Sequence, residues 1–326
     1  MMNKTVNRRL LLAATLLAGL PGALQAQTTF PNRAITLIVP FAPGGIADVM
    51  ARAVAEAMAK SLGQAVVVDN RPSAGSIVAT QAVVSARPDG HTLLLMSNSN
   101  AVSVGLFKKL PYDTVKDLVP VSTLGFFDLA LFAPANTRFG TVQQALQFAK
   151  ANPGQLKMGT ISVGTTQHLA AKLFETVSGA DLLTIPYKGS PAVLMALRSG
   201  EIDLALEIVG PMLPQLSAGA VKALAVTTNQ RNPALPEVQT LQQAGVAGYN
   251  VSSWNAIAVP AATPPAVVER LNRAIREAIA SAPVIAKLEK LGMRLQAGTP
   301  EQAQALLSSD IKRWGEVISA AKIEAE

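Results

Sequence analysis

The sequence predicts an α/β protein in two lobes, with mostly parallel sheets that carry helices on both faces. Short, apolar, β-branched runs alternate with longer segments of helical periodicity between residues 35 and 227. Strands that alternate with crossover helices form mostly parallel sheets, and helices then cover both faces. A length of 326 residues suits two lobes better than one sheet, and 49% hydrophobic residues can form a large core. This composition excludes a disordered protein.

The expected elements follow one another with few gaps. Strands are expected at 35–40, 65–68, 92–96, 129–132, 157–160, 182–186, 202–206 and 223–227, and helices at 46–62, 76–85, 142–151, 166–178 and 191–199. Gly63, Gly179 and Gly200 follow three of these helices at the position where a left-handed residue commonly ends a helix. The last third is mainly helical, with helices expected at 263–281 and 283–291 and a third from Thr299, which we expect to pack onto the first lobe.

The chain is expected to cross between the lobes twice, near residues 126–132 and again near 254–259. Lobe 1 then comprises residues 27–127 plus 256–326, and lobe 2 comprises residues 128–255. No internal repeat or low-complexity linker interrupts this pattern.

The first 26 residues have the pattern of a signal peptide. Lys4, Arg8 and Arg9 precede an apolar stretch at 10–20, which is shorter than a membrane span, and the best cleavage site follows Ala26. The arginine pair leaves a twin-arginine export route open. We therefore expect the mature protein in the periplasm.

Charge and composition exclude several classes of function. Of the 28 Lys and Arg residues, three lie in the signal segment, so the mature chain keeps a net charge of about +4 against 21 acidic residues. No Lys/Arg-rich run follows, so no nucleic-acid binding is expected. The chain has no cysteine and only two histidines, which excludes disulfides and leaves too few ligands for a zinc site. We expect no cofactor.

Polar, glycine-containing turns follow several expected strands and supply the candidate ligand-binding residues. They are Pro43, Gly44, Gly45 and Ile46 with Asp48; Ser97, Asn98 and Ser99 in a loop; Ser162, Gly164, Thr165, Thr166 and His168; Tyr187, Lys188 and Gly189; and Glu207 at the end of a strand. In open α/β sheets, ligands bind at the carboxyl ends of the strands. Helix N-termini there offer free N–H groups to an anion. The turns therefore predict capture of an anion between the lobes.

Several of these residues have a second interpretation. Asp48 is expected to cap its own helix rather than contact a ligand, and His168 could line the cleft or face solvent. Glu207 could orient Tyr187 or Lys188, or face solvent. Ser162 with His168 leaves a hydrolase open, because a catalytic triad is defined by geometry. Nucleophile-elbow, P-loop and dinucleotide-binding motifs are absent from the sequence.

Longer motifs add a family resemblance. They include Phe30-Pro31-Asn32-Arg33, Ile38-Val39-Pro40-Phe41-Ala42-Pro43-Gly44-Gly45, Asp69-Asn70-Arg71-Pro72, Pro88-Asp89-Gly90-His91-Thr92-Leu93, Ile185-Pro186-Tyr187-Lys188-Gly189 and Leu224-Ala225-Val226-Thr227. Across essentially the whole mature chain they resemble the Bug family, the substrate-binding receptors of tripartite tricarboxylate transporters. Two departures stand out: Ser73 and Ser76 replace family glycines, and Glu207 replaces an aspartate.

The resemblance implies a type II periplasmic binding-protein fold with a hinge of two strands. It also implies a receptor, not an enzyme, that holds a small carboxylate through backbone amides, hydroxyls and water and delivers it to membrane permease subunits. We expect a monomer. The same closure could serve a ligand sensor with a signalling partner, because a fold alone does not determine function. The sequence does not name the carboxylate.

Overall fold

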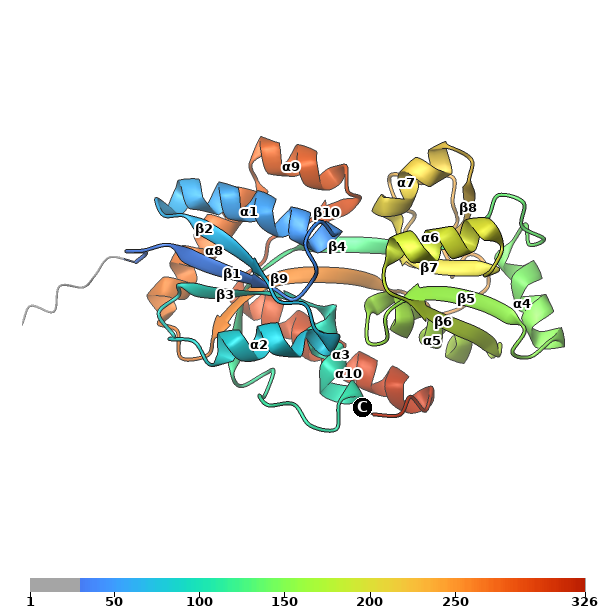
Figure 1. The fold of residues 1–326 in the computed structure, drawn as a ribbon, viewed down its shortest axis with the longest axis horizontal. Helices are drawn as coiled ribbons and strands as arrows, with labels where there is room; N and C mark the ends of the chain where they lie inside the picture. The colour runs from blue at the N-terminus through green and yellow to red at the C-terminus, as the bar shows by residue number, and fades with distance from the viewer. Residues whose placement is uncertain (1–29, 326) are drawn as a thin grey trace, which may run out of the picture.

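Two sheets share a long strand in the computed structural model, which describes residues 30–325 (Figure 1). The first sheet contains β1 (Ile35–Val39), β2 (Val66–Asn70), β3 (Thr92–Ser97), β9 (Ser252–Pro260) and β10 (Met293–Leu295). The second contains β5 (Leu156–Ile161), β6 (Leu182–Tyr187), β7 (Leu204–Ile208) and β8 (Val221–Val226). Strand β4 (Leu118–Pro134) pairs with β9 and β10 in the first sheet and with β7 and β8 in the second.

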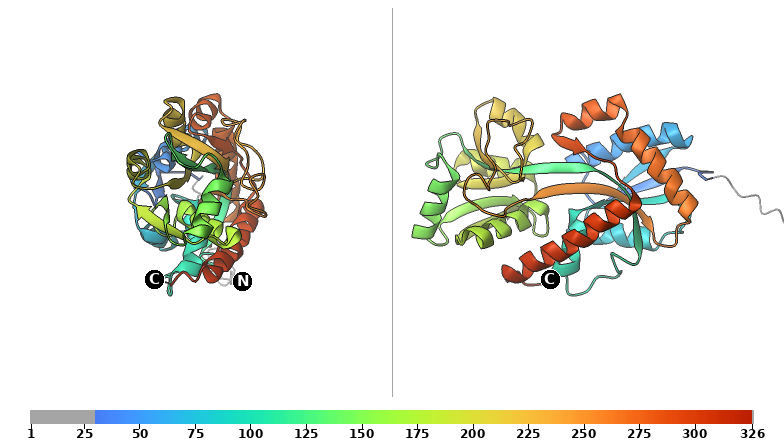
Figure 2. Two further views of the ribbon diagram at one scale, coloured as in Figure 1. Left: turned by 90° about the vertical axis from the view of Figure 1, so that its right-hand side faces the viewer. Right: turned by 180° about the vertical axis from the view of Figure 1, so that it is seen from behind.

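The strands joined by crossover helices are parallel, as predicted. They pair in the order β2-β1-β3 in the first sheet and β7-β5-β6 in the second. Strands β4 and β9 run antiparallel to their neighbours and extend between the two lobes, which is clearest from behind (Figure 2). The α/β, two-lobed fold class is confirmed. The lobe boundaries at residues 127/128 and 255/256 stay a prediction, and the signal segment lies outside the described residues.

Helices cover both faces of each sheet. The helices are α1 (Ile46–Leu62), α2 (Ile77–Val84), α3 (Asn98–Leu106), α4 (Val142–Ala151), α5 (Thr166–Ser178), α6 (Ser190–Ser199), α7 (Val209–Ser217), α8 (Pro265–Ile279), α9 (Ala282–Glu289) and α10 (Pro300–Ala320). In β3, Leu93 and Leu95 pack toward α1 and α8, while Leu94 and Met96 pack toward α2, α3 and α10. Since side chains alternate along a strand, two apolar faces need two layers of helices.

The second sheet is covered in the same way. Leu129 and Leu131 of β4 belong to the core formed with α4 and α5, and Ala130 and Phe132 to the core formed with α6 and α7. The C-terminal helices pack onto the first lobe as expected, with α8 and α9 against α1 and with α10 against α3. Among residues 30–325, no helix is both long and apolar enough to cross a membrane.

The structure differs from the predicted elements in three places. The 97–100 segment is not a loop, because Ser97 caps α3 and forms a capping box with Asn100. Strand β4 is far longer than expected and bulges near Pro120 and Gly125, two residues that ordinarily interrupt strands. Helix α7 was not predicted, because Pro214 lies inside it and tertiary packing outweighs its poor helix propensity.

Candidate ligand-binding site

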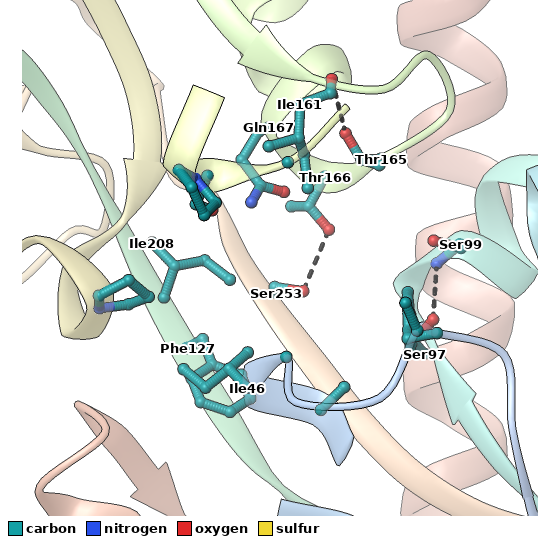
Figure 3. A pocket seen from close by; sticks show the side chains of 18 of the residues that line it. Ile46, Ser97, Ser99, Phe127, Ile161, Thr165, Thr166, Gln167, Ile208 and Ser253 are labelled. Carbon is teal, nitrogen blue, oxygen red and sulfur yellow. Dashed lines mark hydrogen bonds between the residues drawn. The ribbon is translucent and has the colours of Figure 1, made fainter. Parts of the chain in front are cut away.

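A cavity of about 660 Å³ lies between the two lobes (Figure 3). The last residues of β3 and β5, the turns that follow β1 and β6, and the N-termini of α1, α3, α5 and α6 line it. Nine of the predicted site residues line it: Pro43, Gly44, Gly45, Ile46, Ser97, Ser99, Thr165, Thr166 and Gly189. Eight others do not: Asp48, Asn98, Ser162, Gly164, His168, Tyr187, Lys188 and Glu207.

The turn before α1 forms one wall of the cavity. Gly44 adopts a φ of 80°, a conformation that favours glycine, and Gly45 precedes α1 with no side-chain cap. The N–H groups of the first turn of α1 are therefore not taken up by a cap, and these are the groups that bind anions at helix N-termini.

Asp48 stabilises this turn by hydrogen bonds. Its Oδ2 accepts the Gly44 N–H at 2.9 Å and the Arg52 Nε–H at 3.0 Å, and its Oδ1 accepts Asn70 Nδ2 at 3.0 Å. Burial raises the pKa of this carboxyl, but the hydrogen bonds from Arg52, Gly44 and Asn70 outweigh it and the pKa is lowered. Asp48 thus holds the turn and does not line the cavity.

The start of α3 forms the adjoining wall. Ser97 accepts the Ser99 N–H at 3.3 Å, while Asn100 Oδ1 accepts the Ser97 N–H at 2.9 Å. Both serines line the cavity. Their hydroxyls and the positive end of α3 make this region suited to a negatively charged group.

A chain of hydrogen bonds enters the cavity from α10. The Nε1–H of buried Trp314 donates to Asn98 Oδ1 at 2.7 Å, Asn98 Nδ2 donates to Thr166 Oγ1 at 2.9 Å, and Thr166 Oγ1 donates to Ser253 Oγ at 3.1 Å. Indole nitrogen is only a donor, so it sets the orientation of the Asn98 amide. With Thr166 donating to Ser253, the Ser253 hydroxyl can donate its own proton to a ligand. Asn98 acts through Thr166 and not by direct contact with the cavity.

The turn before α5 supplies Thr165, Thr166 and Gln167 to the opposite wall. Thr165 caps the helix by accepting the His168 N–H at 3.3 Å, and Ser162 is exposed outside the cavity. His168 is buried; burial, and then the neighbouring Lys172 ammonium, lowers its pKa to about 4. It is a neutral residue of the packed interior, and no hydrogen bond joins it to Ser162 among the described residues, so the hydrolase alternative gains no support.

The turn before α6 contributes Gly189, Ser190 and Pro191 to the cavity. Gly189 takes the N-cap position of α6. Tyr187 donates to Glu201 at 2.8 Å, and burial together with Glu201 raises the pKa of Tyr187 to about 12. The side chains of Tyr187 and Lys188 lie outside the cavity lining.

Glu207 is buried beside the cavity, in neither of the two positions expected for it. It is completely buried at the end of β7; its Oε2 accepts Gln167 Nε2 at 3.3 Å and the Ile208 N–H at 3.1 Å. Burial raises its pKa to about 7. Its partner is the cavity residue Gln167, whereas Tyr187 is bonded to Glu201, so the expected contact with Tyr187 or Lys188 is wrong.

Sequence reasoning missed the residues that other elements bring to the cavity. They are Gln167, Ser190, Ser253 and Asn255 among the polar ones, and Phe41, Phe127, Ile161, Leu194, Ile208, Pro211 and Met212 among the apolar ones. Ser253 and Asn255 flank buried Trp254 on β9, so period-2 alternation was an available signal. The apolar side chains carried no distinguishing signal, because they resemble core residues.

No residue that lines this cavity is Asp, Glu, His, Lys or Arg. Within residues 30–325 there is also no group of three or more acidic or histidine side chains placed to hold a metal ion. The lining offers hydroxyls, amides and backbone N–H groups, which can bind and orient a ligand by hydrogen bonds.

Comparison with known proteins identifies the family. Residues 50–323 match the family model described as the tripartite tricarboxylate transporter family receptor. The chain belongs to this family. Its members are solute-binding receptors rather than enzymes. The chain is 35% identical to the protein BugT of Bordetella pertussis over 303 residues, which cover 92% of this chain and 93% of BugT. The resemblance to Bug proteins is thereby confirmed.

Solved structures agree with this assignment. The receptor is similar to R. palustris Rpa4515 with adipate, at 31% identity and a TM-score of 0.82, covering 90% of this chain and 99% of that one. It is also similar to MatC of Rhodopseudomonas palustris with bound malate, at 30% identity and a TM-score of 0.80. The match covers 89% of this chain and 100% of MatC.

Proposed function

We propose that this receptor captures a small carboxylate between its lobes in the periplasm and delivers it to the membrane subunits of a tripartite tricarboxylate transporter. The observation that carries the proposal is the convergence of several helix N-termini on a cavity lined by uncharged residues. Such termini favour an anion, and hydroxyls at the same wall can donate to its oxygens. Relatives with adipate and with malate support the ligand class.

The carboxylate would lie between the starts of α1 and α3 on one side and Thr166 and Ser253 on the other. Ser97, Ser99 and Ser253 supply hydroxyl donors, and the unblocked first turn of α1 supplies N–H groups. Ordered water can bridge the remaining distances at modest cost. Of the 17 predicted site residues, the nine that line the cavity are the ones we assign to direct contact.

Ligand binding would favour the closed arrangement of the lobes. Strands β4 and β9 connect the two lobes (Figure 1). Residues from both lobes line the cavity. A ligand that contacts both walls binds the closed form more tightly, so closure follows as a shift in population. Export of the chain by its N-terminal segment would place it beside the permease, and a monomer would suffice for this role.

The test is a thermal-shift screen of the mature, ligand-stripped chain against small carboxylates and the matching amides. A ligand at about 100 times its Kd adds roughly 2.7 kcal/mol to the free energy of unfolding. We expect a carboxylate to stabilise the protein and its amide to fail. Ser99→Ala should weaken this effect, whereas Ser319→Ala, at an exposed position on α10, should not. Equal stabilisation by acid and amide would refute the anion site.

Transport is tested separately in cells. Deletion of the gene for this receptor should abolish uptake of the stabilising carboxylate. The transcriptional response of the cells to that carboxylate should stay intact. The reverse result would favour the sensor alternative over delivery to a permease.

A further inference from the structure

The cavity has a polar end and an apolar end. Ser97 and Ser99 lie on one side, Thr166 and Ser253 in the middle, and Phe127 and Ile208 on the opposite side (Figure 3). The two ends come from different parts of the fold. Ser99 belongs to α3 and Ser97 caps it, whereas Phe127 and Ile208 belong to β4 and β7. A ligand that spans the cavity therefore meets hydroxyl donors at one end and mainly hydrocarbon at the other, where the side chains of Gln167 and Ser190 are already hydrogen-bonded to Glu207.

The apolar end is continuous with the protein core. Phe127 and Met212 are each 1% exposed, and Ile208 packs against the same core as Phe127. Leu194 of α6 and Pro211 of α7 complete this end. Burial of apolar ligand surface against these side chains is favourable in proportion to the area removed from water.

Helix α7 also begins at this end, yet it offers few donors to a second anion. Pro211 in its first turn has no N–H group, and the Ile208 N–H is bonded to Glu207 Oε2 at 3.1 Å. Gly210 packs so closely that an added Cβ would lie 1.8 Å from the carbonyl oxygen of Leu291. Neither α1 nor α7 has a side-chain cap, so the first turn of α7 differs from that of α1 in containing a proline.

Charge at the apolar end opposes a second carboxylate. No cationic side chain is among the residues that line the cavity, and the nearest carboxyl, Glu207, lies directly behind the lining residue Gln167. An ionised group without a cationic partner is costly to bury, so this end of the cavity disfavours a second carboxylate.

From this division of the cavity we infer that the receptor selects a monocarboxylate with an extended, uncharged apolar body. The carboxylate lies at the serines of α3, and the body extends along Phe127 and Ile208 toward Leu194, Pro211 and Met212. The inference rests on the proposed carboxylate function and narrows it. It separates this receptor from the relatives with adipate and with malate, both of which are dicarboxylates.

The test compares hexanoate, adipate and hexanamide by isothermal titration calorimetry with the mature chain. Hexanoate and adipate have the same six-carbon chain and differ only in the distal group. We expect hexanoate to bind at least about tenfold more tightly than adipate, and hexanamide not to bind. Octanoate should bind more tightly than hexanoate, by up to about fourfold for each buried methylene.

The outcomes separate the two proposals. If adipate binds as tightly as hexanoate or more tightly, or if affinity does not rise from hexanoate to octanoate, the apolar-body inference is wrong and the carboxylate function stands. If none of these acids binds, the apolar-body inference is wrong as well; if hexanamide binds as well as hexanoate, the carboxylate function and the inference both fall.

Two neighbouring residues of α6 supply a matched pair of variants. Leu194 lines the cavity, whereas the side chain of Met195 is 72% exposed. Leu194→Asn should weaken hexanoate binding by about tenfold and leave adipate binding nearly unchanged, and Met195→Asn should alter neither. Equal effects of the two variants on hexanoate would overturn the inference, and circular dichroism of both variants verifies that they fold.

Discussion

Two buried polar clusters join the lobes, and they differ in charge and in position. The crossing cluster consists of Asp128, Arg294 and Asn232. The cavity chain consists of Trp314, Asn98, Thr166 and Ser253. The first contains an ion pair on the strand that both sheets share, whereas the second contains only neutral groups and ends in the cavity wall.

The crossing cluster holds β4 where it passes from one sheet to the other. Asp128, 3% exposed, accepts two hydrogen bonds from Arg294 of β10, at 3.1 and 3.2 Å, and one from Asn232 at 2.9 Å. Its neighbour Phe127 pairs with β10 and Leu129 pairs with β7. This carboxylate therefore stabilises the crossing itself and has no contact with the cavity.

The cavity chain couples a distant helix to the ligand. Its bond between Asn98 and Thr166 joins α3 to α5, and two of its hydroxyls line the cavity. A neutral chain costs less to separate than an ion pair, so it suits a contact that opens and closes. The comparison teaches that the fold separates stability from binding: the charged cluster serves the first and the neutral chain the second.

The largest effect is expected at the crossing cluster. Asp128→Ala leaves the buried Asn232 amide without its acceptor and removes the ion-pair partner of Arg294, which is itself 47% exposed. It should lower the free energy of unfolding by about 2 kcal/mol, because a buried donor without a partner is costly. Urea denaturation measures this loss. Asp69→Ala is the control, since Asp69 and Arg71 form a half-exposed pair at 2.8 Å, where less than about 1 kcal/mol is expected. Similar losses in the two variants would refute a special role for the crossing cluster.

The next effect concerns the two titratable groups beside the cavity chain. The pKa of Glu207 is raised to about 7, so its contribution to stability is largest below pH 4.5 and is lost as pH rises toward 7. The pKa of His168 is lowered to about 4, so its contribution is complete above pH 6.5 and is lost as pH falls toward 4. Between pH 4.5 and 6.5 the two groups change the free energy of unfolding in opposite directions. The free energy of unfolding of the wild type should therefore be nearly independent of pH in this range.

Glu207→Gln removes the contribution of Glu207 to the pH dependence of the free energy of unfolding. Its unfolding free energy should then rise by on the order of 2 kcal/mol from pH 5 to pH 6.5, through His168 alone. The double variant with His168→Gln should be flat again. A pH-independent single variant would contradict the assignment of this balance to the pair.

A smaller effect on stability, with a larger effect on binding, is expected at the start of the cavity chain. Trp314→Phe keeps a ring but removes the donor to Asn98, which should cost about 1 kcal/mol and weaken ligand binding several-fold as the amide loses its orientation. Trp254→Phe is the matched control, because Trp254 donates to Asp310 at 2.5 Å outside the cavity lining. It should lower stability and spare affinity. Isothermal titration calorimetry measures the ligand affinity of both variants. Equal losses of affinity would show that the cavity chain does not orient the ligand-binding groups.

The smallest effect on stability is expected at the other end of the chain. Ser253→Ala removes the final hydroxyl and should change the unfolding free energy by less than about 0.5 kcal/mol, yet weaken carboxylate binding. Ser252→Ala, one residue away and absent from the cavity lining, should leave binding unchanged. Unaltered affinity in Ser253→Ala would show that its hydroxyl does not serve the ligand.

Local sequence predicted the parts of the site that depend on turn chemistry. The glycine turn before α1 and the threonines at the start of α5 line the cavity. Each follows a parallel strand, and such turns lie at the carboxyl edge of the sheet, where ligands bind. Glu207 was placed correctly at a strand end, but its partner was not predicted, because Gln167 is 40 residues away in the chain. Ser253 and Asn255 were missed, since their alternation with Trp254 indicates a strand but does not mark β9 as a cavity wall.

By itself the sequence determined the alternation of strands and helices, the ends of α1, α5 and α6, and the family. These depend on periodicity, glycine and capping, which act over a few residues. Only the tertiary structure decided which groups face the ligand. Trp314 and Asn98 are 216 positions apart, and Phe127 and Ile208 look like ordinary core residues until the lobes meet. A cavity between lobes is built from contacts distant along the chain, and no local pattern encodes them.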